Sequence, residues 1–352
     1  MQRHATQRPQ LSGREIIYRS SVKMSKQAVH NARARQMKKT NGITNFQTLI
    51  TLKDYHLLTS EGEEKPFFGS KEALCYMAST NFMFADGSFK CVPPAYSQLC
   101  IFHTHVANNV SFPQLFCLVK WKNGDFYTRL LLLVEGLAAA NGMTFFNRRM
   151  TLMCDFESSF INAVHQLFHS VIVKCCLFHY TKNLRVKATP IINNIKRQTG
   201  NMSETHFVAE KTKRRFMMLP LIPVELVTSE VVARILLARS DHCPNGHKDE
   251  FNEIAETLIR TYIGRPPTYP FPIDPRFPPS LWSVCGMSVR TNNSAESVHA
   301  QLNPKVGGKL SLVRFLCIIE GQIRRNRIRI HEGCKSESHA VQIEKNRLLG
   351  LE

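Results

Sequence analysis

The order of apolar patterns between residues 79 and 178 constrains the fold more than any other feature of the sequence. Three β-prone segments come first, at 81–92, 98–106 and 111–121. Asp-Gly and Asn-Asn pairs interrupt this region. The four segments that follow indicate helix, strand, helix and strand, at 126–142, 149–156, 157–169 and 170–178. This order predicts an α/β protein in which three antiparallel strands precede alternating helices and strands of one mixed sheet.

Two acidic residues occupy unusual positions in these predicted strands. Asp86 lies within the first strand, and Asp155 directly follows the apolar run "MTLMC". A buried carboxylate is costly unless it is paired, hydrogen-bonded or bound to a cation, so two such acids indicate a metal site. Two simpler explanations stay open, because Asp86 before Gly87 can shape a turn and Asp155 can cap the next helix. The β-β-β-α-β-α-β order matches the ribonuclease-H-like arrangement, in which the first and fourth strands adjoin and their acids converge.

The remainder of the chain predicts a helical insertion in this core. Basic, amphipathic segments fill the insertion at 185–265, and a proline-rich connection over 266–280 should be extended surface chain. Trp282 can stack on a DNA base, but burial between insertion and core is the favoured prediction. The predicted domains are an arm at 1–45, a pre-core segment at 46–78, the catalytic core in two pieces at 79–184 and 281–330, and a tail at 331–352.

Charge indicates a polyanionic partner. The 352 residues carry a formal net charge of +19, and the first 40 hold ten lysines and arginines against one acid. Nucleic acid is the simplest such partner, and an anionic membrane is a poorer alternative. The arm at 1–45 is predicted to be flexible and basic, and a role in DNA contact, in targeting or as a linker remains open.

The cysteines and the apolar segments indicate an intracellular protein with reduced thiols. The eleven cysteines show no disulfide-scaffold rhythm, and no N-terminal segment resembles a secretory signal. The most apolar window, "LLLLVEGLAAANGM", contains Glu135 and is far shorter than a span of roughly 20 residues. No membrane segment is therefore expected.

A third acid lies late in the chain, in "RTNNSAESVHAQLN". The polar "NNS" predicts a helix start near Ala295, so that Glu296 falls in the first turn and His299 shares its face. The simplest explanation is that Glu296 complements the positive end of the helix dipole. His299 can equally orient Glu296, contact phosphate or be a packed core histidine.

Four ordered blocks resemble those of the Mutator-like element (MULE) transposases, namely "FADGSFKCVPPAYSQLCIFHTHV", "LMCDFESSFINAVHQLF", "KCCLFHYTKNL" and "RTNNSAESVHAQLN". The resemblance covers about residues 80–325. It implies that Asp86, Asp155 and Glu296 are the catalytic acids and hold two Mg²⁺ or Mn²⁺ ions, whereas Glu157 is not a ligand. The implied reaction is phosphodiester cleavage and strand transfer at transposon ends. The implied partner is double-stranded DNA, both the terminal inverted repeats of the transposon and the target DNA. The resemblance also implies a nuclear enzyme that can form a homo-oligomer.

The third block also resembles the family's Cys-x-x-His element, which corresponds to Cys176 and His179. This spacing suits two zinc ligands, but a tetrahedral site needs four, so zinc is not expected and a structural or DNA-positioning role is preferred. Asn293 and His299 are further auxiliary candidates in the fourth block.

One departure from the family pattern keeps a second function open. Family members usually carry a zinc-dependent DNA-binding region before the core, whereas the first 74 residues here contain no cysteine. The alternative is therefore a truncated or domesticated protein, catalytically inactive, that binds DNA in a regulatory role.

Overall fold

The computed structural model describes residues 67–88, 92–93, 96–106, 110–240 and 248–291, with shorter pieces at 298, 302, 314–316 and 318–326. All but residue 314 belong to one compact unit, which comprises Tyr55–Ser311 and Phe315–Glu352. Every helix in these described stretches is too short or too polar to cross a membrane.

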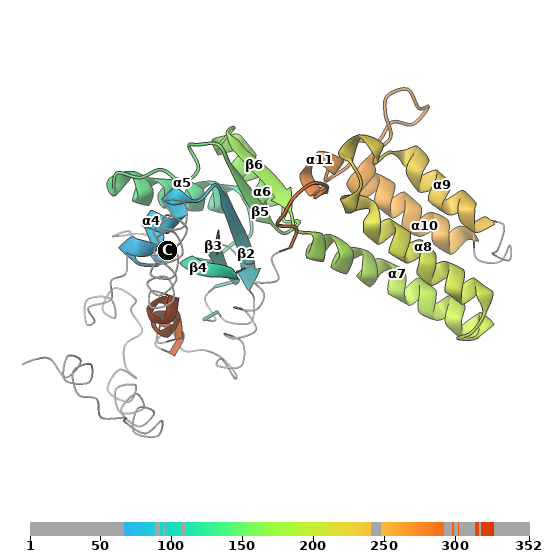
Figure 1. Cartoon of the computed structure of the whole chain (residues 1–352), viewed down its shortest axis with the longest axis horizontal. Helices are drawn as coiled ribbons and strands as arrows, with labels where there is room; N and C mark the ends of the chain where they lie inside the picture. The colour runs from blue at the N-terminus through green and yellow to red at the C-terminus, as the bar shows by residue number, and fades with distance from the viewer. Residues whose placement is uncertain are drawn as a thin grey trace, which may run out of the picture. The chain divides into compact units, whose positions relative to one another are not determined.

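A six-stranded mixed sheet forms the first part of this unit (Figure 1). Its order is β1-β4-β3-β2-β5-β6, with bounds Phe67–Phe68, Val110–Val119, Gln98–Val106, Phe82–Ser88, Met150–Cys154 and Val171–Cys175. The first four strands in this order pair antiparallel, whereas β2, β5 and β6 pair parallel. The predicted α/β fold with a mixed sheet is therefore confirmed, and β1 is an additional edge strand that was not predicted.

Three helices accompany the sheet: α4, Lys71–Ser79; α5, Gly124–Ala140; and α6, Ser158–Leu167. Asn123 begins α5 because its side chain accepts a hydrogen bond from the Phe126 amide. Alternation along β2 places Met83 and Ala85 in the main core together with α5 and α6. Phe84 packs instead with Met153 and Cys176 in a second cluster. Asp86 follows Phe84 by two positions and therefore projects from the second face.

The buried Glu135 of α5 shows why one acid interrupts the most apolar segment of the chain. Its carboxylate accepts hydrogen bonds from the Thr144 hydroxyl at 2.7 Å and from the Phe145 and Phe146 amides at 3.1 and 2.9 Å. The Asn147 side-chain amide donates a further bond at 3.2 Å. Glu135 thus satisfies the backbone of the loop that leads into β5.

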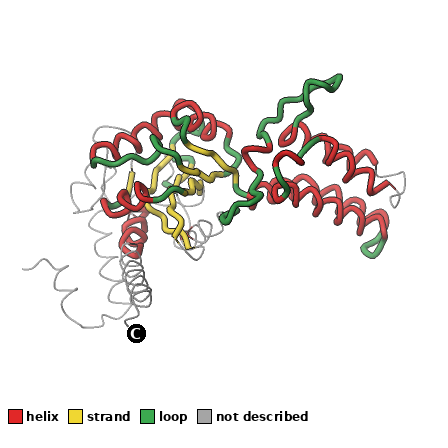
Figure 2. Tube along the Cα trace, turned by 45° about the horizontal axis from the view of Figure 1, so that its top comes forward, coloured by secondary structure: helices red, strands yellow, loops and turns green. Residues whose placement is uncertain are grey.

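The segment after the sheet is helical, as Figure 2 shows in red. Its main helices are α7, α8, α9 and α10, at Leu177–Thr199, Glu204–Met218, Ser229–Ser240 and Lys248–Leu258. A π-helical turn, Ile259–Ile263, follows α10. Because α7 begins two residues after β6 and runs without a break to Thr199, the predicted boundary between residues 184 and 185 falls inside a helix.

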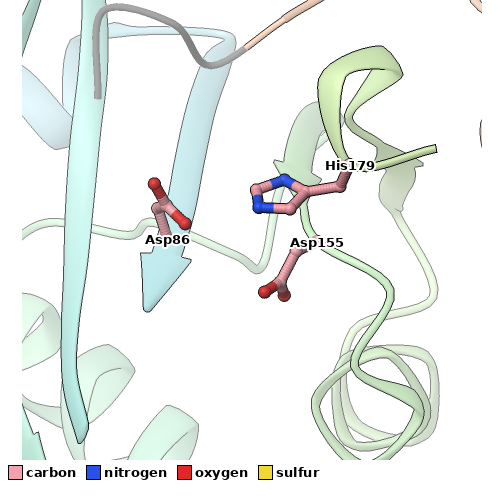
Figure 3. A group of neighbouring side chains, drawn as sticks. All are labelled: Asp86, Asp155 and His179. Carbon is pink, nitrogen blue, oxygen red and sulfur yellow. The ribbon is translucent and has the colours of Figure 1, made fainter. Parts of the chain in front are cut away.

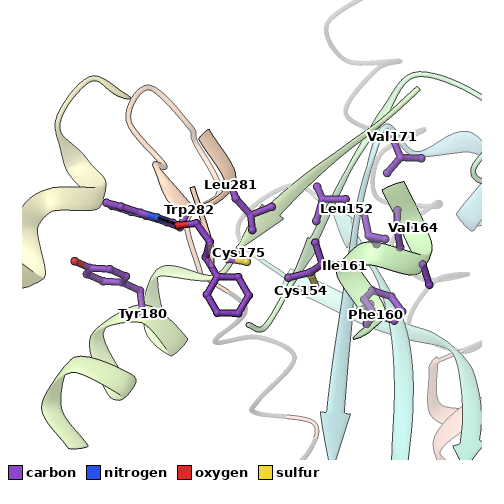
Figure 4. Close-up of a cluster of buried hydrophobic side chains, with 14 of the residues drawn as sticks. Leu152, Cys154, Phe160, Ile161, Val164, Val171, Cys175, Tyr180, Leu281 and Trp282 are labelled. Atoms are coloured by element: carbon purple, nitrogen blue, oxygen red, sulfur yellow. Dashed lines mark hydrogen bonds between the residues drawn. The ribbon is translucent and has the colours of Figure 1, made fainter. Parts of the chain in front are cut away.

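Trp282, at the end of α11 (Pro279–Trp282), lies in an aromatic cluster that joins the sheet region to the helices (Figure 4). Its side chain is fully buried and stacks on Tyr180 of α7 at 5.0 Å between ring centroids. The indole Nε1 donates to the carbonyl oxygens of Tyr262 and Phe277 at 3.0 and 2.9 Å. The predicted burial of Trp282 is confirmed, and base stacking by this residue is excluded by its full burial.

The proline-rich connection is closed at its base by a short antiparallel bridge. Arg265 and Ile273 exchange backbone hydrogen bonds of 2.9 and 3.1 Å. Gly264, which precedes the bridge, has φ of 83°, and a Cβ there would lie 2.6 Å from the Ile273 carbonyl oxygen. Only glycine fits this conformation and this close approach.

Replacement of Gly264 by alanine is expected to lower the free energy of unfolding by about 2–4 kcal/mol, because positive φ and the backbone clash both add strain. Urea unfolding followed by circular dichroism measures the change. Gly136→Ala is the matched control, since Gly136 is exposed on α5 and a Cβ there meets nothing within 4 Å. It should stabilise the protein by roughly 0.5–1 kcal/mol. Equal effects of the two substitutions would contradict the assigned geometry.

Candidate metal centre

Parallel pairing of β2 with β5 brings the two predicted acids together. In the register of this pair Ala85 lies opposite Cys154, so the next residues along the two strands are Asp86 and Asp155. Asp86 is only 4% exposed, and Asp155 is partly buried where the chain leaves β5. Two acids that lie far apart in the sequence, with β3, β4 and α5 between them, thus become neighbours because β2 pairs with β5.

His179 joins these acids from the first turn of α7 (Figure 3). Strand β6 pairs with β5 so that Cys175 lies opposite Cys154, and α7 starts just beyond this point. One potential ligand atom from each of Asp86, Asp155 and His179 lies within 4.8 Å of the others. The three side chains therefore form a group with the spacing of a metal site.

The two simpler explanations for the acids are wrong. Asp86 lies inside β2 opposite Ile101, rather than in a turn, although its Oδ1 accepts a 2.9 Å hydrogen bond from the Gly87 amide. Helix α6 has Glu157, rather than Asp155, as its N-cap residue, and the Glu157 side chain makes no capping hydrogen bond. Helix capping therefore gives no reason for an acid at position 155.

The ionisation of the group suits a cation. Burial raises the pKa of Asp155, while the positive charges of Lys122 and Lys182 act in the opposite direction. Burial and the charge of Lys182 lower the pKa of His179 to about 4, so its imidazole is neutral at neutral pH and offers a nitrogen lone pair. A divalent cation would compensate the two carboxylates and accept the imidazole nitrogen.

A series of side-chain hydrogen bonds from Gln98 through Tyr127 fixes another carboxylate, that of Glu157. The Gln98 side-chain amide donates to the Tyr127 hydroxyl, which donates to Glu157 Oε1 at 2.7 Å. Burial, and then the charge of Glu157, raise the pKa of Tyr127, so its hydroxyl remains a donor. Gln98 also packs against Gly87, where a Cβ would lie 3.0 Å from Gln98 Oε1. Sequence reasoning missed this chain, because Gln98 and Tyr127 carry no local signal of their partnership.

A cavity of about 340 Å³ opens beside the metal-ligand group. Cationic and anionic side chains line it together. Its lining comprises Lys122, Asp155, Phe156, Glu157, Ser158, Ser159, His179, Asn183 and Arg276. Such a lining can hold a metal ion on its carboxylates and a phosphate on its lysine and arginine.

The remaining predicted site residues have different outcomes. Cys176 is fully buried and packs with Phe84 and Met153. The metal-ligand group found among the described residues contains His179 but not Cys176. Asn293, Glu296 and His299 lie outside the described residues.

Neither a scan against protein-family models nor a search of curated proteins gave a match to this chain. The functional argument therefore depends on the geometry of the site itself.

Mn²⁺ is expected to stabilise the protein through this site. At ten times its Kd the ion should raise the melting temperature by roughly 2–3 °C, because it binds the folded state. Asp86→Asn and Asp155→Asn should abolish the rise, since each removes a charged ligand with little change in shape. Asp274→Asn, at an exposed position in the proline-rich connection, is the control and should retain it. Equal Mn²⁺ stabilisation of all four proteins would place the ion elsewhere.

Proposed function

We propose that this chain is a metal-dependent DNA-processing enzyme that cleaves phosphodiester bonds and transfers strands, as a transposase of the Mutator-like class. The observation that carries the proposal is the convergence of Asp86 and Asp155 from adjoining parallel strands. Two carboxylates that converge in this way are suitable ligands for the metal ions of two-metal phosphoryl transfer. The four sequence blocks that resemble the MULE transposases add the reaction type.

The topology of the sheet supports a ribonuclease-H-like core in this proposal. After β1 and α4, the antiparallel strands β2, β3 and β4 follow one another in the chain, and helices α5 and α6 precede β5 and β6 in turn. In the proposed arrangement the first and fourth core strands adjoin, and β2 and β5 are neighbours in the sheet. Helices α7 to α10 would then constitute the insertion before the third acid.

The residues of the site fit divalent metal ions. Asp86 and Asp155 would hold the ions, His179 would add a neutral nitrogen ligand, and Glu296 is proposed as the third acid. The imidazole makes Mn²⁺ as suitable as Mg²⁺, which prefers oxygen ligands alone. When bound, such ions supply activation of the attacking water or 3′-hydroxyl and stabilisation of the leaving oxygen.

Other side chains of the cavity would bind and orient the substrate. Lys122 and Arg276 line it and would contact phosphate oxygens that the carboxylates alone would repel. Lys122 Nζ also lies 3.9 Å from Glu157 Oε2, which is held by Tyr127. Glu157 would therefore orient a lysine toward the phosphate, consistent with its not being a proposed metal ligand.

Helix α7 provides a basic surface that begins at the metal-ligand group. It contains no acidic residue, and its exposed basic side chains are Lys182, Arg185, Lys187, Lys196 and Arg197. Such a surface favours a DNA backbone through phosphate contacts and counterion release. An enzyme that acts on chromosomal DNA would work in the nucleus, and this location is part of the proposal.

The same basic helix would serve a non-catalytic DNA-binding protein, which is the second candidate function. Both candidates share a DNA partner, so binding alone does not separate them. Only the dependence of cleavage on the acids distinguishes an enzyme from a regulatory descendant.

Cleavage is the first test of the proposal. The full chain should nick supercoiled plasmid DNA in Mg²⁺ or Mn²⁺ and not in EDTA, as measured on agarose gels. Asp86→Asn and Asp155→Asn should each reduce the rate by at least about a hundredfold, because a charged ligand at the reacting centre is removed. If wild type and both variants bind DNA but none cleaves it, the non-catalytic candidate is favoured and the enzyme is rejected.

DNA binding through α7 is the second test. Replacement of Arg185, Lys187 and Arg197 by alanine should weaken binding of a fluorescein-labelled duplex and reduce its salt dependence. The slope of log K against log salt should fall by about 0.9 for each phosphate that the variant no longer neutralises. Arg129→Ala removes an exposed arginine from α5 and serves as the control. An unchanged slope in the triple variant would exclude α7 as the DNA-binding surface.

A further inference from the structure

A second and larger cavity, of about 630 Å³, lies between α6, the strand β6 and the segment 276–281. Its size falls within the range of about 300–1,000 Å³ that is typical of small-molecule sites. No role in the proposed metal chemistry uses it. Its lining comprises Ser158, Ile161, Asn162, His165, Val171, Ile172, Val173, Arg276, Phe277, Pro278, Ser280 and Leu281.

This cavity adjoins the cavity beside the metal-ligand group, because the two share lining residues. Ser158 and Arg276 line both. Arg276 Nε donates a 3.0 Å hydrogen bond to Ser158 Oγ, which ties the proline-rich connection to the first residue of α6. A ligand with one part at Asp155 and another part in the larger cavity would therefore pass Arg276.

The walls of the larger cavity are amphipathic. Ile161, Val171 and Leu281 give it apolar walls, and Phe277 adds an aromatic ring. Asn162, His165 and Ser280 provide polar groups, whereas no carboxylate lines this cavity. Arg276 is its permanently charged side chain. The chemistry suits a ligand that has an apolar ring, hydrogen-bonding edges and an adjoining negative charge.

The cavity is held open by contacts that need no ligand. Lys174 Nζ donates to the carbonyl oxygens of Ser280 and Ser283 at 2.6 and 3.2 Å, which fixes this segment beside β6. The buried indole of Trp282 anchors the same segment from the other side. A preformed cavity lowers the ordering cost of binding.

We propose that this cavity receives one unstacked nucleotide of the DNA strand whose phosphate lies at Asp86 and Asp155. The inference rests on the proposed function, because it needs a phosphodiester at the metal-ligand group. The base would lie against the aliphatic walls and the small exposed part of the buried Phe277 ring, while Arg276 neutralises the phosphate that leads into the metal site. Burial of the base offsets the cost of its removal from the stack.

An extended peptide added to the edge of β6 is the competing occupant. The contacts of Lys174 with Ser280 and Ser283 already cover one end of this edge. Continuity with the metal-ligand group and the single positive charge of Arg276 also favour a nucleotide.

Two single-stranded probes of equal length and charge test the proposal. One is a fluorescein-labelled 12-mer of deoxythymidine, and the other has the same backbone with abasic residues throughout. The full chain should bind the first probe roughly 5- to 100-fold more tightly in fluorescence anisotropy, as expected for one bound base. Asn162→Trp fills the cavity from an exposed position of α6 and should remove this preference while keeping the affinity for the abasic probe.

Gln166→Trp is the matched control, because Gln166 is exposed one turn further along α6 and does not line the cavity. It should bind both probes as wild type does. If Asn162→Trp retains the full preference, the nucleotide cavity is rejected while the proposed function stands. If neither probe binds wild type, the proposed function fails and this inference fails with it.

Photocrosslinking provides a measurement that needs no substitution. A 12-mer that contains 5-iodouracil should crosslink to the tryptic peptides 150–174 or 277–290, which carry His165 and Phe277. Crosslinks confined to other peptides would overturn the proposal. If an added extended peptide lowered the yield of crosslinks to these two tryptic fragments, and deoxythymidine monophosphate did not, the cavity would be assigned to a peptide at the β6 edge instead.

Discussion

The parallel pairing of β2 with β5 is the interaction on which the candidate site depends. One register, with Ala85 opposite Cys154, puts Asp86 beside Asp155 and leaves Phe84 and Met153 together on the same face. A slip by one residue would turn Asp86 toward the apolar core with α5 and α6. The buried side chains on both faces of these strands therefore specify the site as strictly as they specify the sheet.

A second constraint places the imidazole. Helix α7 follows β6 directly, and its Tyr180 is buried between Trp282 and Tyr262, while the Tyr180 hydroxyl donates to the Phe216 carbonyl oxygen. His179 precedes this anchored tyrosine and is therefore held at the edge of the sheet. The aromatic cluster thus has two effects: it packs the helices together, and it fixes the orientation of the first turn that carries the candidate ligand.

The sequence was sufficient to predict the α/β class, the two strand acids and the burial of Trp282, because these depend on local periodicity and on side-chain size. It was insufficient for contacts that form only after the chain folds. His179 was expected to act with Cys176, whereas Cys176 packs in an apolar cluster and His179 belongs to the group with the two acids. The Gln98–Tyr127–Glu157 chain joins a strand, a helix and a loop, so no spacing could reveal it. The predicted role of Glu296 concerns a residue outside the described part of the chain and stays a prediction.

The unbroken course of α7 from Leu177 to Thr199 has a mechanical consequence. A helix of this length spans about 34 Å, and buried side chains hold both halves, Tyr180 next to His179 and Ile195 near the other end. If the helix tilted about the end near His179, a displacement of about 3 Å at Thr199 would correspond to a tilt of only about 5°. Pro190, about half way along, also removes one backbone hydrogen bond and softens the outer half. A small movement of the basic outer turns would therefore change the direction of the first turn, and of the imidazole on it, only slightly.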